Sequence, residues 1–131
     1  MTKRMIKAIS IDPFTCTVSE VEYDAAEYSN IYPLLSHQLH PVECFTTAQV
    51  DTLKGLDALF VDDNGLLNGP IRFFQIAGGY QPFAGKGLII GADEEGDSQS
   101  AETPIDLVRM SVMFLERVGT GLIEVTWPLR N

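Results

Sequence analysis

The sequence predicts one α+β domain over residues 1–131, with a curved, mainly antiparallel sheet and two helices packed on one of its faces. Three observations predict this class. Short apolar segments rich in strand-forming residues recur along the chain, turn residues separate them, and the order Thr103-Pro104 near the C-terminus is typical of a helix start. A chain of 131 residues is long enough to bury one hydrophobic core without disulfide bonds.

The middle of the chain contains the strongest turn signal. Residues 58–61 form a short apolar run, Asn64-Gly65 follows, and Leu66-Leu67 returns as an apolar segment. Asn and Gly tolerate the positive φ angles of a type I′ turn, whose twist suits a two-stranded hairpin. The sequence therefore predicts a central β-hairpin that turns at Asn64-Gly65.

The other elements are predicted from periodicity and from breaking residues. Paired strands are expected at 5–11 and 17–23, a helix within 24–39, an extended segment at 41–50, a buried strand at 88–90, a helix from 103 and a last strand at 122–127. Two segments, 71–76 and 112–118, suit either a helix or a strand. The polar stretch 92–102 is expected to be a mobile loop. The predicted core consists of Leu59, Phe60, Val61, Leu88, Ile89, Ile90, Leu107, Ile123 and Val125.

Charge and composition narrow the classes of function. The net charge of -9 repels phosphate backbones, so direct nucleic-acid binding is not expected. No apolar run is long enough to cross a bilayer, and no secretory leader follows Met1. The two cysteines, Cys16 and Cys44, are too few for a disulfide scaffold. These features predict a cytoplasmic protein without a membrane partner. They are compatible with either a monomer or a homo-oligomer.

Gly85-Lys86-Gly87 invites comparison with a phosphate-binding loop. A Walker motif requires a glycine where Tyr80 stands and a hydroxyl residue where Gly87 stands, so that interpretation fails. A weaker hypothesis is that the backbone amides of the glycines and the Lys86 ammonium bind an anion. The alternative is a structural connection before the strand at 88–90.

Two metal patterns are weak. His37, His40 and Cys44 have a spacing that zinc could use, but surface histidines at a helix C-terminus and a core cysteine are the preferred explanation. The run from Asp62 to Gly65 lacks the acidic residue that completes a calcium loop. Neither a metal site, nor a cofactor, nor a set of catalytic residues is predicted.

Several segments recur together in a known family. Asp12-Pro13 after the first strand, residues 61–67, residues 83–91 and the acidic loop that follows resemble a family of small uncharacterised proteins encoded by bacteriophages, plasmids and bacterial mobile elements. The resemblance covers about the first three-quarters of the chain. It implies a genomic context and assigns no chemistry.

Two functions are expected from the residues and this context. The first is a non-enzymatic small-molecule-binding protein that sequesters a nucleotide-derived host immune signal, with anti-defence activity in the host cytoplasm. The second is an acidic protein–protein inhibitor, or nucleic-acid mimic, that blocks a basic host protein. An enzyme acting on a small metabolite is a third possibility. The ligand-binding residues predicted for the first function lie in one glycine-rich segment: Tyr80, Gln81, Phe83, Gly85, Lys86 and Gly87. The alternative is that Phe83 belongs to the core and that Tyr80 is a turn residue.

Overall fold

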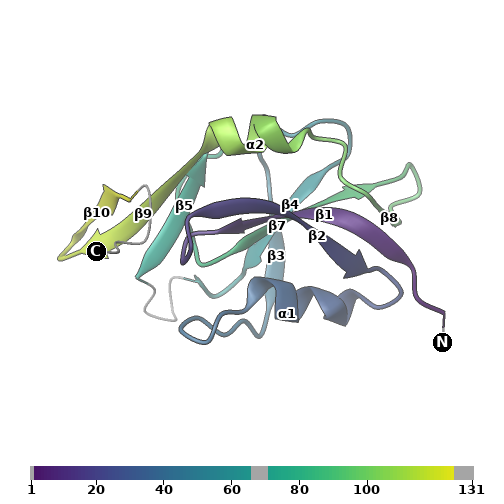
Figure 1. The fold of residues 1–131 in the computed structure, drawn as a ribbon, viewed down its shortest axis with the longest axis horizontal. Helices are drawn as coiled ribbons and strands as arrows, with labels where there is room; N and C mark the ends of the chain where they lie inside the picture. Colours follow the sequence, from purple (N-terminus) through teal and green to yellow (C-terminus); the bar gives the residue numbers. More distant parts are fainter. Residues whose placement is uncertain (1, 66–70, 126–131) are drawn as a thin grey trace.

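Two antiparallel sheets form the scaffold of the protein. The structure is a computed structural model that describes residues 2–65 and 71–125. The first sheet has the strand order β2-β1-β7-β4-β3, with β8 paired to β7, and the second has the order β10-β9-β5-β6. Figure 1 shows that β5, β9 and β10 extend away from the first sheet.

The elements have the following bounds in chain order. The first half contains β1 (Met5–Asp12), β2 (Thr17–Asp24), a 3-10 turn η1 (Tyr28–Asn30), α1 (Ile31–Leu35), β3 (Phe45–Ala48) and β4 (Ala58–Asp62). The second half contains β5 (Arg72–Ile76), β6 (Phe83–Ala84), β7 (Gly87–Ala92), β8 (Ser98–Gln99), α2 (Ile105–Ser111), β9 (Val112–Val118) and β10 (Gly121–Glu124).

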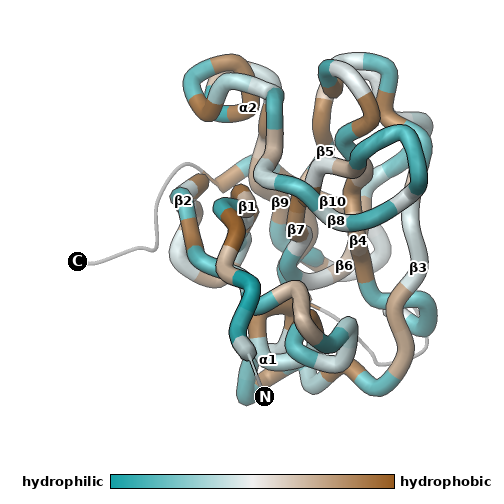
Figure 2. Tube along the Cα trace, turned by 90° about the vertical axis from the view of Figure 1, so that its right-hand side faces the viewer, coloured by the Kyte–Doolittle hydropathy of each residue, from teal (hydrophilic) through white to brown (hydrophobic). Residues whose placement is uncertain are grey.

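Both faces of the first sheet are covered. Successive side chains of a strand point to opposite faces, so Ile9 and Ile11 of β1 pack with Val108 of α2 in the main core. Ala8, which directly precedes Ile9 and points to the opposite face, packs with Ile31 of α1 in a second cluster. The two helices therefore lie on opposite faces of the sheet (Figures 1 and 2), and the prediction that they share one face is wrong.

The second sheet contributes one face to the main core. Phe74 and Ile76 of β5 are fully buried in that core. Phe73 points to the other face and forms a small separate cluster with Ala84 and Leu115. The second sheet is thus joined to the first through one shared apolar layer.

Local sequence signals were correct for most strands. The predicted pair at 5–11 and 17–23 is β1 and β2, and the two ambiguous segments are the strands β5 and β9. The predicted helix within 24–39 is reduced to η1 and α1, with Pro33 in the first turn of α1. The predicted loop at 92–102 contains the short strand β8.

Thr103 does not cap α2 as the sequence predicts. Pro104 occupies the N-cap position and makes no side-chain cap bond. The Thr103 hydroxyl instead donates to the Asp57 carboxylate at 2.6 Å and accepts the Lys54 N–H at 2.8 Å. It therefore ties the start of α2 to the turn that precedes β4.

The central hairpin is also corrected. β4 pairs with β3 along one edge and with β7 along the other, so no edge of it is left for a hairpin partner. Gly65 lacks the positive φ that a type I′ turn requires. The predicted return strand at 66–67 lies outside the described residues.

Most of the predicted core is confirmed. Leu59, Val61, Leu88, Ile89 and Ile90 are buried, while Phe60, Leu107 and Val125 are half-buried. Ile123 is 50% exposed, so its prediction is wrong. It lies on the edge strand β10, opposite Glu116 of β9. None of the helices in the described ranges combines the length and the apolar character needed to cross a membrane.

Candidate ligand-binding cleft

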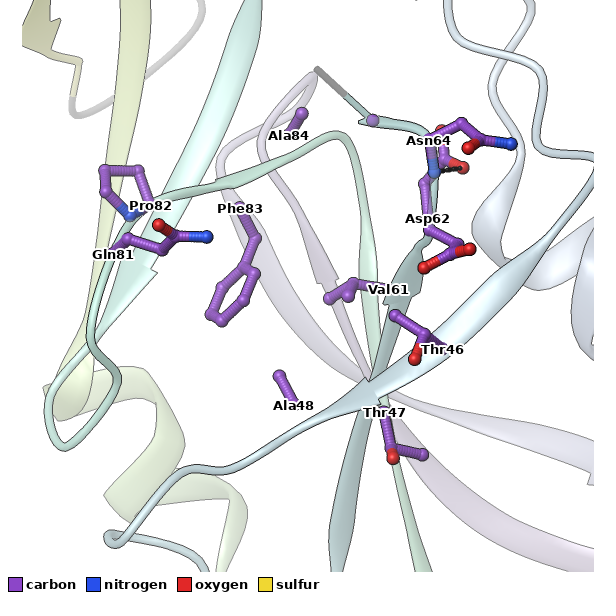
Figure 3. Close-up of a pocket in the computed structure, with 12 residues that line it drawn as sticks. Thr46, Thr47, Ala48, Val61, Asp62, Asn64, Gln81, Pro82, Phe83 and Ala84 are labelled. Atoms are coloured by element: carbon purple, nitrogen blue, oxygen red, sulfur yellow. Dashed lines mark hydrogen bonds between the residues drawn. The ribbon is translucent and has the colours of Figure 1, made fainter. Parts of the chain in front are cut away.

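A cleft of about 490 Å³ opens where the two sheets meet. Its walls come from β3, from the end of β4 with the turn after it, and from the segment that includes β6. The lining residues are Thr46, Thr47, Ala48, Val61, Asp62, Asp63, Asn64, Gly65, Gln81, Pro82, Phe83 and Ala84. Segments that are distant in sequence therefore form one concave surface (Figure 3).

The floor of the cleft is apolar. Figure 3 shows the Phe83 ring directed toward the space that Ala48 and Val61 border. Val61 is buried in the main core, and Ala48 and Phe83 pack against that core. The Phe83 ring also lies 5.5 Å from the Phe74 ring, centroid to centroid. The floor is thus an extension of the core that remains partly open to solvent.

The rim of the cleft is polar. Thr46, Asp63 and Gln81 are exposed, and Asn64 is half-buried. No described residue forms a hydrogen bond with the side chains of these four residues, so their polar groups face solvent. An apolar floor with a few convergent polar groups is the usual composition of a small-molecule site.

One wall of the cleft is fixed by a buried, hydrogen-bonded pair of side chains. Asp62 accepts a hydrogen bond from His40 Nε2 at 2.8 Å, and both side chains are 1% exposed. The second Asp62 oxygen accepts the Asn64 N–H at 3.0 Å. His40 is held in turn by two backbone hydrogen bonds with His37. The Asp62 carboxylate is therefore rigidly positioned before any ligand arrives.

Gly85 has a packing role beside this pair. Its φ is +78°, and a Cβ at this position would lie 2.7 Å from His40 Cδ2. A side chain would therefore collide with the buried imidazole and adopt a strained backbone conformation. The His40 Nδ1 atom is buried and has no hydrogen-bond partner among the described residues. The imidazole is enclosed by protein.

The six residues predicted as a ligand site are distributed over different environments. Gln81 and Phe83 line the cleft. Tyr80 is 84% exposed, and neither it nor Lys86 lines the cleft. Gly87 is buried at the start of β7, where a Cβ would meet Phe74 at 2.6 Å. The structure thus brings two of the six residues to the cleft and places Gly85 behind its wall.

The contribution of β3 and of residues 61–64 to the cleft was not predicted from the sequence. Asp62, Asp63 and Asn64 were assigned only to a turn. A run of polar residues at the end of a buried strand was the available signal, because such residues gather at a sheet border. The partner segment could not be identified without the strand order.

The three residues with zinc-like spacing, His37, His40 and Cys44, lie in different environments and do not form a metal site in the structure. His37 stacks on Phe14 at 3.9 Å, centroid to centroid, and its Nδ1 accepts the Leu39 N–H. His40 is paired with Asp62, and Cys44 is exposed. In the described ranges, one group of three acidic residues has ligand atoms within 4.8 Å of one another, and it lies elsewhere, at Asp93, Glu95 and Asp97.

Comparison of the chain with protein-family models, with curated proteins and with solved structures finds no match. A function for this chain is therefore inferred from its own geometry.

Proposed function

We propose that the protein is a non-enzymatic binding protein that holds a small molecule in the cleft between the two sheets. The observation that carries this proposal is the extension of the main core into an open, apolar floor at Ala48, Val61 and Phe83. The rim side chains of Thr46, Asp63, Asn64 and Gln81 surround this floor, and they form no hydrogen bond with a described residue. Such a surface gains free energy when a ligand covers it, because apolar area leaves water and the rim groups acquire hydrogen bonds.

The residues of the cleft favour binding over chemical conversion. Its lining includes no histidine, cysteine, serine or lysine among the described residues. The His40 imidazole lies behind the cleft wall, its ring is enclosed and its Nε2 is engaged by Asp62. A general base must reach the proton that it removes. The apolar floor and the polar rim of the cleft suit recognition of a ligand.

The charge of the cleft restricts the ligand. A nucleotide-derived immune signal remains a prediction, as does an origin in a phage or mobile element. Asp62 and Asp63 would repel the phosphates of such a ligand, and Lys86 does not line the cleft. The site is better suited to a ligand, or to a part of one, that presents hydrogen-bond donors.

A second function is proposed from a different surface. The exposed carboxylates of Glu95 and Asp97 lie close to that of Asp93, and the whole chain has a net charge of -9. A basic protein would be attracted to this turn, as expected for an acidic inhibitor. Capture of a basic partner that weakens steeply with salt, and that is lost in the Glu95→Gln/Asp97→Asn variant, supports this function.

The cleft proposal is tested by blocking its floor. We expect Ala48→Leu to fill the space beside Phe83 and to abolish the binding of fragments found by NMR screening of the wild-type protein. Ala26→Leu makes the same change at an exposed turn and should leave binding unchanged. If fragments bind Ala48→Leu as tightly as they bind wild type, the ligand site is elsewhere.

A further inference from the structure

We infer that the cleft selects an organic cation, a ligand with an amine, amidine or guanidine group beside a small apolar body. This inference rests on the proposed function, because it names the ligand class of the same cleft. Its basis is that two carboxylates and an aromatic ring border one space, with no cationic side chain among the described lining residues.

Asp63 is the group that can contact the cation directly. It is exposed at the rim, its carboxylate forms no hydrogen bond with a described residue, and its backbone N–H donates to the Cys44 carbonyl at 2.9 Å. The backbone is therefore fixed while the carboxylate is available to solvent. A charged donor such as an amidinium makes a stronger hydrogen bond to a carboxylate than a neutral amide does.

Asp62 contributes a charge that cannot move away. Its carboxylate is buried and accepts hydrogen bonds from His40 and from the Asn64 backbone. These bonds keep it in place at the wall of the cleft. When the His40 imidazole is neutral, the pair carries the negative charge of Asp62, and water screens a buried charge less than an exposed one. Asp62 then adds attraction for a cation without contacting it.

Phe83 provides the third element of recognition. Its ring is half-buried and is directed into the cleft (Figure 3). The face of an aromatic ring attracts a cation that lies within about 6 Å of its centroid. The side-chain carbonyls of Asn64 and Gln81 can accept further N–H donors at the rim. The arrangement therefore suits a flat cationic group that stacks on Phe83 and donates to Asp63.

Benzamidine and benzamide provide a matched pair of probes, because they share a flat ring and differ in charge. We expect amide-shift titrations of the wild-type protein to give benzamidine an affinity about tenfold higher, as a charge-assisted hydrogen bond would. Asp63→Asn should remove most of this preference. Glu43→Gln removes the same charge from an exposed residue outside the cleft and should retain the preference.

The outcomes separate the two proposals. Equal affinities for both probes, or a preference that survives in Asp63→Asn, overturn the inference of a cationic ligand. If binding of both probes is then still lost in Ala48→Leu, the cleft remains the ligand site and only the ligand class is wrong. If Ala48→Leu binds both probes as wild type does, the proposed function fails with the inference.

Discussion

Two turns of the chain share the pattern Asp-x-x-Gly and differ in almost everything else. One begins at Asp62 and ends at Gly65, and the other begins at Asp93 and ends at Gly96. In each turn the aspartate accepts the backbone N–H of the residue two positions later, at 3.0 Å in the first and 2.9 Å in the second. The two turns therefore share this one local hydrogen bond.

Their surroundings set their roles. Asp62 is buried against His40 at the border of an apolar cleft. Asp93 lies at the start of a solvated turn, and its other partners are Asp97 N–H and the Gln99 side chain. An acidic turn therefore becomes a candidate binding site only when the fold places an apolar, concave surface beside it.

The largest expected difference between the turns concerns the aspartates. Asp62→Ala leaves His40 Nε2 and the Asn64 N–H without their partner, and each unsatisfied group typically costs about 1–3 kcal/mol of stability. Asp93→Ala removes an exposed carboxylate and should change the unfolding midpoint only slightly. Urea denaturation of both variants measures this difference. Equal midpoints would mean that the buried pair does not stabilise the cleft wall.

Gly85 and Gly96 give the next largest contrast. Both have positive φ, but only Gly85 faces a buried ring, His40. Gly85→Ala should cost about 2–4 kcal/mol, because backbone strain adds to overpacking. Gly96→Ala has open space and should cost only the strain, about 1 kcal/mol. Thermal unfolding that ranks the two variants in the opposite order would contradict the packing role of Gly85.

Gly65 and Gly96, the last residues of the two turns, are glycine for different reasons. A Cβ at Gly65 would lie 3.0 Å from Ala84 Cβ, whereas Gly96 has φ +91° and nothing nearby. Asparagine tolerates positive φ, so Gly96→Asn should be nearly neutral. Gly65→Asn should lose about 1–3 kcal/mol through crowding. Chemical denaturation that shows Gly65→Asn to be the milder change would show that space is not what selects glycine there.

The smallest expected effect is the pH dependence of Asp93. Hydrogen bonds from backbone N–H groups, that of Asp97 first, hold the pKa of this carboxyl below its ordinary value. A lowered pKa in the folded state stabilises the protein above the unfolded pKa of about 3.9, and this contribution is lost as pH falls through the folded pKa. The stability advantage of wild type over Asp93→Asn should therefore shrink below pH ~4 in urea titrations. If the stability advantage of wild type over Asp93→Asn instead grew as the pH fell, the pKa of Asp93 would be raised and not lowered in the folded state.

The sequence predicted elements whose signals are local. β1, β2 and β7 follow from alternation, β-branched residues and adjacent turns. The hairpin at Asn64-Gly65 was wrong because β4 finds its partners β3 and β7 through the sheet and not through the next turn. Local turn chemistry gives no information about which distant strand will occupy an edge.

Like the fold, the candidate site was predicted from the sequence only in part. Gln81 and Phe83 were selected because glycines, an aromatic ring and a cation occur together in their segment, and these two residues do line the cleft. Asp62 and Asp63 were missed as site residues because their nearness to Phe83 depends on the order of strands in two sheets. The burial of His40 against Asp62, 22 positions away, likewise has no local signal.

The most direct test of the cleft as the ligand site is a map of backbone amide shifts on titration with benzamidine. We expect the largest shifts at residues 46–48, 61–65 and 81–84, and small shifts at residues 93–99. That result would place the cation at the Asp-x-x-Gly turn with the apolar floor. Shifts concentrated at residues 93–99 would show that exposed carboxylates alone attract the cation and would contradict the assignment of the cleft.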